Sequence, residues 1–136
     1  WGHAFSLFVN GTKLRLEGAQ GANFSTFIPF TMNWGVLFRK QRVGVIVRWN
    51  YRGEANIGSI TSFGPDGATY SKRVTQMDIT LDYQITKRLS ISANVKNLLN
   101  ADDVQLRYGA QTPAYARQLR SYEYGALVAV GIKGSF

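Results

Sequence analysis

The sequence has 136 residues, 45% of them hydrophobic and 13% aromatic, which is enough material for one domain. The absence of cysteine excludes a disulfide scaffold and any thiolate site, and the absence of an apolar run of about 18 residues excludes a membrane-spanning helix. The formal net charge of +8 fits either an anionic partner, such as nucleic acid, or basic side chains that line a polar lumen, and we favour the lumen.

The first predicted strand covers residues 4–17. It begins with apolar Phe5, Leu7 and Val9 at every second position, and successive side chains of a β-strand point to opposite faces. The alternation changes phase near Gly11, where we expect either a β-bulge or the point at which the strand leaves the apolar layer. A glycine-rich loop is predicted to follow.

Residues 28–38 and 43–52 are predicted to form a β-hairpin around a short basic turn. Apolar residues, among them Trp34 and Trp49, occupy one face of both strands. The opposite face of the second strand carries Arg48 and Arg52. One apolar face and one charged face are therefore expected on the same sheet.

A second hairpin of the same design is predicted between residues 74 and 95, with its turn at residues 87–88. Its apolar face includes Met77, Ile79 and Tyr83, and its polar face includes Asp78 and Asp82. The strands are longer than the usual length of about 5–6 residues in soluble sheets and match the roughly 9–11 residues needed to cross a bilayer. The pattern predicts a transmembrane hairpin.

A last strand is predicted over residues 122–136, and the segments 53–72 and 99–120 are predicted to be long loops. Short connections thus alternate with long ones, as in outer-membrane barrels with short periplasmic turns and long extracellular loops. The predicted fold is an all-β, antiparallel transmembrane β-barrel. Because single-chain barrels of this kind use at least about 8 strands, the six or so strands are expected to be the C-terminal part of a larger barrel.

Three segments resemble TonB-dependent outer-membrane receptors. The run Leu89–Asn100 (LSISANVKNLLN) resembles the penultimate-strand motif of that family, and Trp49–Arg52 (WNYR) resembles one of its strand ends. The segment Tyr124–Phe136 resembles its terminal strand with an aromatic last residue, although Gly134 stands where a larger apolar residue is common.

This resemblance implies a barrel of about 22 strands with a plugged lumen. It implies energised uptake of a scarce solute, which could be a siderophore, a vitamin, a metal complex or a glycan. The implied location is the outer membrane of a Gram-negative cell, with the plug and the motor-binding box upstream of Trp1. The implied partners are outer-membrane lipid, a TonB-type energy-coupling protein and the barrel assembly machinery, which recognises the strand ending at Phe136. A surface lipoprotein is a further candidate partner, and nucleic acid is not expected.

Three groups of candidate site residues follow from the pattern. The first faces the lumen, where it contacts the plug or an anionic substrate or forms a structural ladder of ion pairs; it consists of Arg48, Arg52, Asp78, Asp82, Asn94 and Lys96. The second forms an aromatic girdle at the membrane interface and consists of Trp34, Trp49, Tyr51, Tyr83, Tyr124 and Phe136. The third lies in the last long loop, where it grips an anionic ligand or folds over the barrel mouth, and consists of Arg107, Tyr108, Tyr115, Arg117 and Arg120.

Catalysis is not expected. His3 is the single histidine, so a triad or a multi-histidine metal site lacks ligands, and Asp102 and Asp103 alone are too few for calcium. No cofactor and no metal are predicted. Two alternatives remain at this stage. One is a small soluble β-barrel that holds an apolar ligand inside, and the other is a surface that binds single-stranded nucleic acid.

Overall fold

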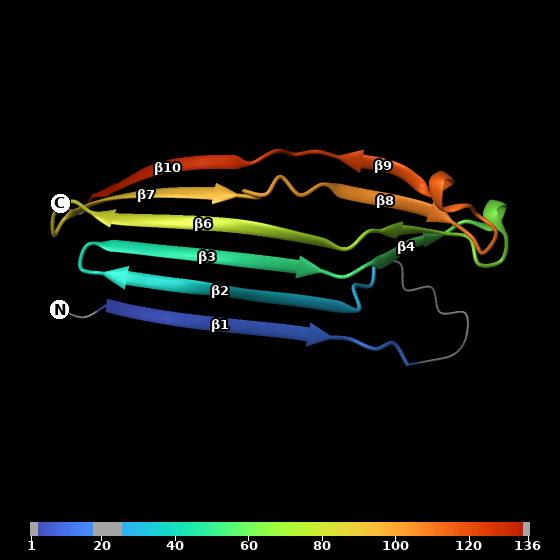
Figure 1. Cartoon of the computed structure of the whole chain (residues 1–136), viewed down its shortest axis with the longest axis horizontal. Coiled ribbons are helices and arrows are strands. Elements are labelled where there is room, and N and C mark those ends of the chain that lie inside the picture. Colours follow the sequence, from blue (N-terminus) through green and yellow to red (C-terminus); the bar gives the residue numbers. More distant parts are fainter. Residues whose placement is uncertain (1–2, 18–25, 135–136) are drawn as a thin grey trace.

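The computed structural model describes residues 3–17 and 26–134, which form two antiparallel β-sheets placed end to end (Figure 1). We call them the long sheet and the short sheet. The long sheet has the order β1-β2-β3-β6-β7-β10, with β1 at His3–Lys13, β2 at Phe30–Lys40, β3 at Val43–Arg52, β6 at Val74–Gln84, β7 at Leu89–Lys96 and β10 at Leu127–Gly134. The short sheet has the order β4-β5-β8-β9, with β4 at Ala55–Ser59, β5 at Ala68–Ser71, β8 at Asp103–Tyr108 and β9 at Gln118–Tyr122. Two 3-10 turns, η1 at Thr61–Phe63 and η2 at Ala114–Ala116, lie in its connections.

The all-β, antiparallel prediction is confirmed, and each of the six predicted strands contains one strand of the long sheet. The expected bulge at Gly11 is wrong. Strands β1 and β2 pair without a register shift from His3 opposite Lys40 to Lys13 opposite Phe30. Gly11 simply takes the place of an apolar side chain opposite Met32, and β1 ends before the two leucines that suggested a change of phase.

The prediction that the long connections are loops is also wrong in part, because they form the short sheet. Segments 53–72 and 99–120 each contribute two strand pieces, and β5 of the first pairs with β8 of the second. These strands are only 4 to 6 residues long and carry little alternation, so the sequence signal is weak. Pairing satisfies backbone groups that a structureless loop would leave to water.

The last strand begins at Leu127 and not at Tyr122. Tyr122 ends β9 of the short sheet, and Gly125 with φ of +70° lies in the irregular link to β10. This positive φ breaks the extended backbone, so the alternation seen from Tyr122 onward in the sequence spans two strands in different sheets.

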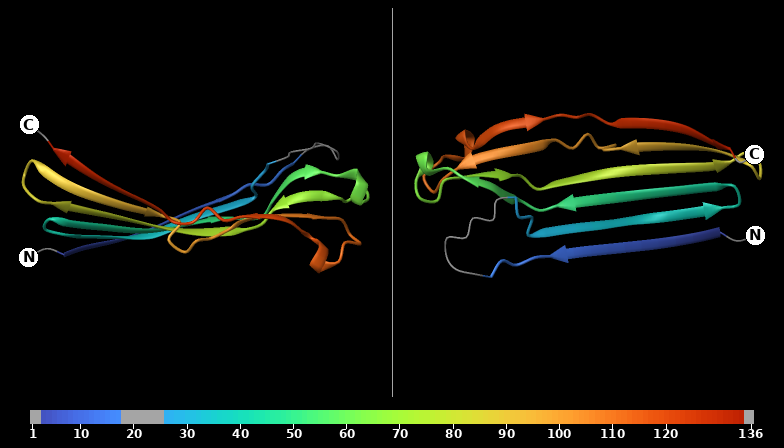
Figure 2. Two further views of the ribbon diagram at one scale, coloured as in Figure 1. Left: turned by 90° about the horizontal axis from the view of Figure 1, so that it is seen from above. Right: turned by 180° about the vertical axis from the view of Figure 1, so that it is seen from behind.

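All short connections of the long sheet lie at one end. The β2–β3 turn and the β6–β7 turn are there, together with the start of β1 and the end of β10, while the short sheet lies at the opposite end (Figures 1 and 2). This arrangement agrees with the predicted alternation of short and long connections.

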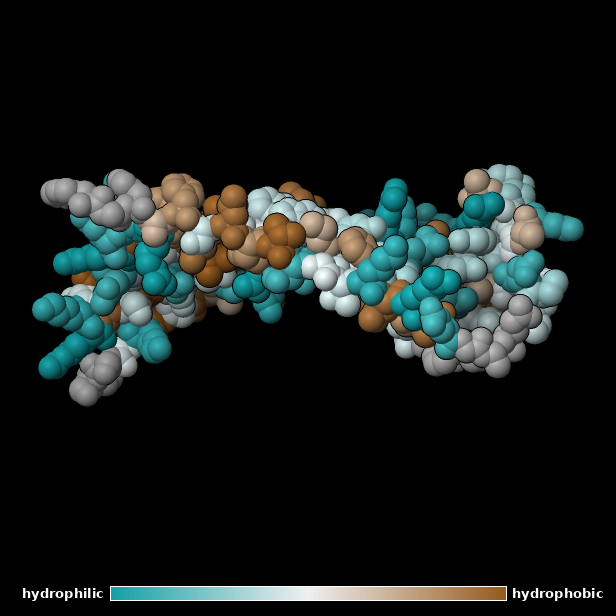
Figure 3. All heavy atoms as spheres, turned by 90° about the horizontal axis from the view of Figure 1, so that it is seen from below, coloured by the Kyte–Doolittle hydropathy of each residue, from teal (hydrophilic) through white to brown (hydrophobic). Residues whose placement is uncertain are grey.

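The register of the long sheet places apolar residues opposite apolar residues in every strand pair. For example, four apolar residues are successive cross-strand neighbours on β1, β2, β3 and β6: Val9, Trp34, Trp49 and Met77. The residue that follows each of them along its strand points to the opposite face. The resulting apolar face is exposed: Leu7 is 80% exposed and Ile132 74%. Brown side chains accordingly gather over the long sheet in Figure 3.

The described residues contain almost no hydrophobic core. Ala55 and Ala68, both in the short sheet, are the buried hydrophobic residues among them. No helix in the described part of the chain is long and apolar enough to cross a membrane. The described sheets are open, so they form neither the closed transmembrane barrel that was predicted nor the enclosed interior of a small ligand-carrying barrel.

Candidate functional site

The predicted lumen-facing residues share one face of the long sheet, which we call the polar face. Arg48 lies directly opposite Asp78 across β3 and β6, yet the two form no ion pair. Asp78 Oδ2 instead accepts a hydrogen bond of 3.0 Å from Asn50 Nδ2, and its Oδ1 accepts one of 3.0 Å from the backbone N–H of Asn97. Because both carboxylate oxygens are engaged, the expected ladder of ion pairs is wrong at this position.

Arg48 contacts an aromatic ring in place of a carboxylate. Its guanidinium carbon lies 5.8 Å from the ring centroid of Phe8 on β1, a cation–π distance. Between them lies Gly35 on β2, which is the direct neighbour of both residues in the sheet. Glycine is required there because a Cβ would collide with the backbone carbonyl oxygen of Val47, and it would also lie 2.5 Å from Phe8 Cζ. The Phe8 ring therefore lies over the backbone of β2.

Four amide side chains form a row across the polar face. Asn10, Asn33, Asn50 and Gln76 are successive neighbours on β1, β2, β3 and β6. Only Asn50 among these four has a side-chain hydrogen bond within the described residues. The amides thus present free donors and acceptors to whatever faces the sheet.

Two shallow hollows flank this amide row and share Asn33 and Asn50. One, of about 480 Å³, also reaches Phe8 and Arg48. The other, of about 360 Å³, also reaches Arg52. The second hollow is lined by apolar and aromatic side chains as well, and its Arg52 is paired with Asp103. Arg48 and the amides are therefore the groups of the two hollows that suit hydrogen-bonding and anionic ligands.

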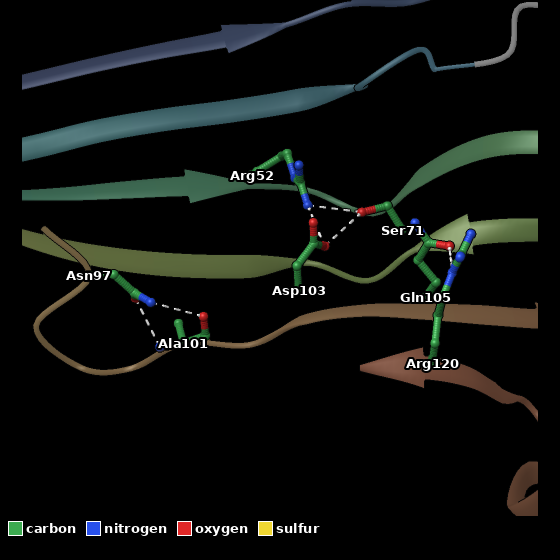
Figure 4. A network of polar contacts seen from close by, with 7 residues as sticks. All are labelled: Arg52, Ser71, Asn97, Ala101, Asp103, Gln105 and Arg120. Carbon is green, nitrogen blue, oxygen red and sulfur yellow. Dashed lines mark hydrogen bonds and ion pairs between the residues drawn. The ribbon is translucent and has the colours of Figure 1, made fainter. Parts of the chain in front are cut away.

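Arg52 joins the two sheets. Its Nη2 donates to Asp103 Oδ1 at 2.9 Å and to Ser71 Oγ at 2.9 Å, from the end of β3 to β8 and β5 (Figure 4). The expectation that Arg52 pairs with the acids of β6 is therefore wrong. Neither Asp82 nor Lys96 has an ion-pair partner among the described residues.

Asn97, which the sequence analysis did not single out, closes the link between β7 and β8. Its Nδ2 donates to the carbonyl of Ala101 at 3.2 Å, and its Oδ1 accepts from Ala101 N at 2.9 Å (Figure 4). The same Nδ2 also donates to the carbonyl of Gly125 at 3.2 Å. Asn97 is only 8% exposed and has φ of +53°, a conformation that asparagine tolerates. Its neighbour on the polar face, Asn94, donates to Thr80 Oγ1 at 3.3 Å.

The predicted ligand-gripping residues of the last connection are brought together only in part. Tyr108 stacks on Tyr70 of β5 with centroids 4.5 Å apart, and the Arg117 guanidinium lies 4.9 Å from the Tyr108 ring. The Tyr108 hydroxyl donates to Glu54 at 3.4 Å. We call Tyr70, Tyr108, Arg117 and Glu54 the tyrosine–arginine cluster. Burial and the negative charge of Glu54 raise the pKa of Tyr108 above its ordinary value.

The other three predicted residues lie apart from this cluster. Arg107 and Tyr108 are consecutive in β8 and so point to opposite faces. Arg120 donates to Gln105 at 2.7 Å (Figure 4), and Tyr115 is 89% exposed. The structure therefore does not bring all five residues into one cluster. Tyr70 and Glu54 were missed because they lie in the preceding connection, far away in the sequence.

The predicted aromatic girdle is placed on the apolar face for four of its six members. Trp34 and Trp49 are cross-strand neighbours whose rings stack with centroids 6.2 Å apart, and Tyr51 and Tyr83 belong to the same face. Tyr124 lies in the link before β10, outside the strand in which it was predicted, and its side chain is 71% exposed. Phe136 lies outside the described residues.

No group of three histidine, cysteine or acidic side chains able to hold a metal ion occurs within residues 3–17 and 26–134. Asp103, which the sequence analysis weighed as a calcium ligand, is engaged by Arg52. Comparison with models of protein families, with curated proteins and with solved structures finds no match to this chain.

Proposed function

We propose that this chain forms part of the wall of a TonB-dependent transporter in the outer membrane of a Gram-negative cell. In this proposal the long sheet crosses the bilayer, its polar face lines the plugged lumen of a barrel of about 22 strands, and the short sheet projects outward from the membrane. The transporter takes up a scarce solute with energy supplied by a TonB-type partner, and it is not an enzyme.

The observation that carries this proposal is the missing core. The chain is 45% hydrophobic, yet the buried hydrophobic residues in its described part are two alanines. Burial of apolar surface stabilises a protein by about 25 cal/mol per Å², so a sheet this apolar needs a nonaqueous environment on that face. The hydrocarbon core of a bilayer provides such an environment, and the strands of the long sheet, which are 8 to 11 residues long, are about the length needed to cross it.

The polarity of the opposite face also supports the proposal. Amides, two arginines and two aspartates follow one another on this face of β3 and β6. A wet lumen tolerates such residues, whereas the interior of a soluble ligand-carrying barrel would require the apolar face to point inward. The tyrosine–arginine cluster then lies at the outer end, where a solute arrives first.

The proposal is tested by asking which face of the long sheet touches lipid. Ile91 and Ser92 are adjacent in β7 and belong to the apolar and the polar face, respectively. Two variants are made in a W34F/W49F background. I91W places a tryptophan on the apolar face, and S92W places one on the polar face. The full-length protein carrying this sequence is reconstituted into vesicles of brominated phosphatidylcholine, whose bromine atoms quench nearby indole rings on contact.

After the fluorescence of the W34F/W49F background is subtracted, we expect strong quenching of the tryptophan in Ile91→Trp and little quenching of the tryptophan in Ser92→Trp. Equal quenching at both positions, or a protein that stays soluble and monomeric without detergent, would overturn the membrane assignment. Retention of the periplasmic domain of a TonB protein by the reconstituted protein would support energised transport. Insertion without such retention would contradict the coupling to TonB.

A further inference from the structure

Basic residues gather at the end of the long sheet that carries the short turns. Six of the 16 basic residues of the chain lie there; we call them the basic rim, and they are Arg39, Lys40, Arg42, Lys87, Arg88 and Lys133. Five of them line a hollow of about 410 Å³, in which Asp82 is the one acidic residue. Teal side chains mark this left end of the molecule in Figure 3.

The two turns of the basic rim are tied to each other. Arg42 Nη1 donates to the carbonyl of Ile85 at 3.2 Å, and the backbone N–H of Gln84 donates to the carbonyl of Arg42 at 2.8 Å. These bonds join the β2–β3 turn to the β6–β7 turn. The cations are therefore held side by side on a common scaffold.

The positive charge of the basic rim is not neutralised within the described residues. None of its six cations forms an ion pair there, and the hollow places five cations against one carboxylate. Like charges held this close repel one another and attract an anion. Charge complementarity therefore predicts an anionic occupant.

Apolar side chains at the same place indicate what kind of anion binds. Val43, Tyr83 and Leu89 also line the hollow, and each is the apolar-face residue of its strand that lies nearest a turn. Arg39, Asp82 and Lys133 reach the same hollow from the polar face, so it lies at the strand ends where the two faces meet. Lys40 follows Phe38 on the apolar side of β2. A ligand at the basic rim therefore meets cations and the end of the apolar face together.

We propose that the basic rim binds the phosphate headgroup of an acidic phospholipid, whose acyl chains lie along the apolar face. This inference rests on the proposed function, which puts this end of the sheet at the periplasmic leaflet. Lysine and arginine beside a membrane surface attract acidic lipid by about 1 kcal/mol each. A free inorganic anion gains nothing from Val43 or Leu89, so the lipid is the occupant that uses both parts of the hollow.

The test titrates the full-length protein carrying this sequence, in a neutral detergent, with short-chain phosphatidylglycerol. Binding is measured by native mass spectrometry, with phosphatidylcholine of the same chain length and inorganic phosphate as competitors. The variant K87Q/R88Q removes two exposed cations from the basic rim. Its matched control, K72Q/R73Q, removes the same charge from an exposed basic pair at the opposite end of the long sheet.

We expect phosphatidylglycerol to bind in preference to phosphatidylcholine, and K87Q/R88Q to weaken that binding about 30-fold, as two cations at about 1 kcal/mol each imply. K72Q/R73Q should leave the affinity unchanged, and added salt should weaken it.

Equal losses in both variants, or equal binding of both lipids, would overturn the proposal. Displacement of phosphatidylglycerol by inorganic phosphate at the same concentration would indicate a site for any anion. Preferential binding of polyglutamate, added as a further competitor, would indicate a site for an acidic peptide. Either result would overturn the proposal that the basic rim binds a lipid. If the Ile91→Trp variant is quenched by brominated lipid while phosphatidylglycerol shows no preference, this inference alone fails. If that quenching is absent, the proposed function fails.

Discussion

Arg52 and Asp103 meet at 2.9 Å across the junction of the two sheets, although 51 residues separate them in the sequence. Both side chains are about one-third exposed, at 35% and 33%, so water weakens but does not abolish their attraction. The same guanidinium also bonds Ser71. One arginine at the end of a long strand thereby positions two strands of the short sheet.

Asp103→Asn should therefore loosen the short sheet without affecting the long one. Loss of the charge-assisted bond costs about 1 kcal/mol, and the backbone amides of β5 and β8 should exchange their hydrogens faster. Hydrogen exchange followed by mass spectrometry measures this by segment. Asp102→Asn is the matched control, because Asp102 precedes Asp103 and has no ion pair among the described residues. Equal acceleration in both variants would contradict a role for the Arg52–Asp103 pair.

Gly35→Ala should destabilise the long sheet by about 1–3 kcal/mol, the usual cost of overpacking. A Cβ at Gly35 would collide with the Val47 carbonyl oxygen, which belongs to the backbone, and with the Phe8 ring. Gly44→Ala on the same face is the control, since its Cβ would meet only Asp82 Cβ at 3.8 Å. Denaturant titration of the folded protein in detergent measures both, and an equal loss of stability in the two variants would show that the contact with Phe8 and Val47 is not the cause.

The long sheet could be predicted from the sequence because its information is local. Alternation over 8 to 11 residues fixes which side chains share a face, and short turns fix which strands pair. That logic correctly placed Trp34 and Trp49 on one face and Arg48 and Asp78 on the other.

The short sheet and the contacts on the polar face could not be predicted in this way. Tyr70 and Tyr108 meet because two distant connections pair, and strands of 4 to 6 residues give no reliable period. Likewise, the alternation places Arg48 directly opposite Asp78, but it does not predict that Asn50 and Asn97 donate hydrogen bonds to the Asp78 carboxylate. Which of several nearby partners a side chain selects depends on rotamers and distances.

Asn97→Ala should cost about 3 kcal/mol, because three side-chain hydrogen bonds are lost at about 1 kcal/mol each. It also places an alanine at φ of +53°, where asparagine is better tolerated. Asn97→Asp keeps the acceptor for Ala101 N but loses both donated bonds, so an intermediate loss is expected. Denaturant titration measures the series. If Asn97→Asp and Asn97→Ala were equally destabilised, the bond from Ala101 would contribute nothing.

The raised pKa of Tyr108 gives the tyrosine–arginine cluster a signature at alkaline pH. Burial is the largest cause, Glu54 adds to it, and Arg117 opposes it. Since the folded-state pKa lies above the ordinary value of 10.0, the folded state holds the phenolic proton more tightly than the unfolded state does. The resulting stability is fully present below that ordinary value and is lost as the pH rises through the folded pKa.

Titration of tyrosinate absorbance should therefore show a late-ionising component that Tyr108→Phe removes. Glu54→Gln takes away a negative charge but keeps a neutral acceptor oxygen, so it should lower the pKa of Tyr108, although burial keeps the pKa above the ordinary value. Arg117→Gln removes a positive charge that favours tyrosinate and should shift the pKa in the opposite direction. A shift of the same sign in both variants could not arise from these two charges and would mean that Glu54 and Arg117 do not both face Tyr108. Opposite shifts would establish that the two connections meet at Tyr108 in solution.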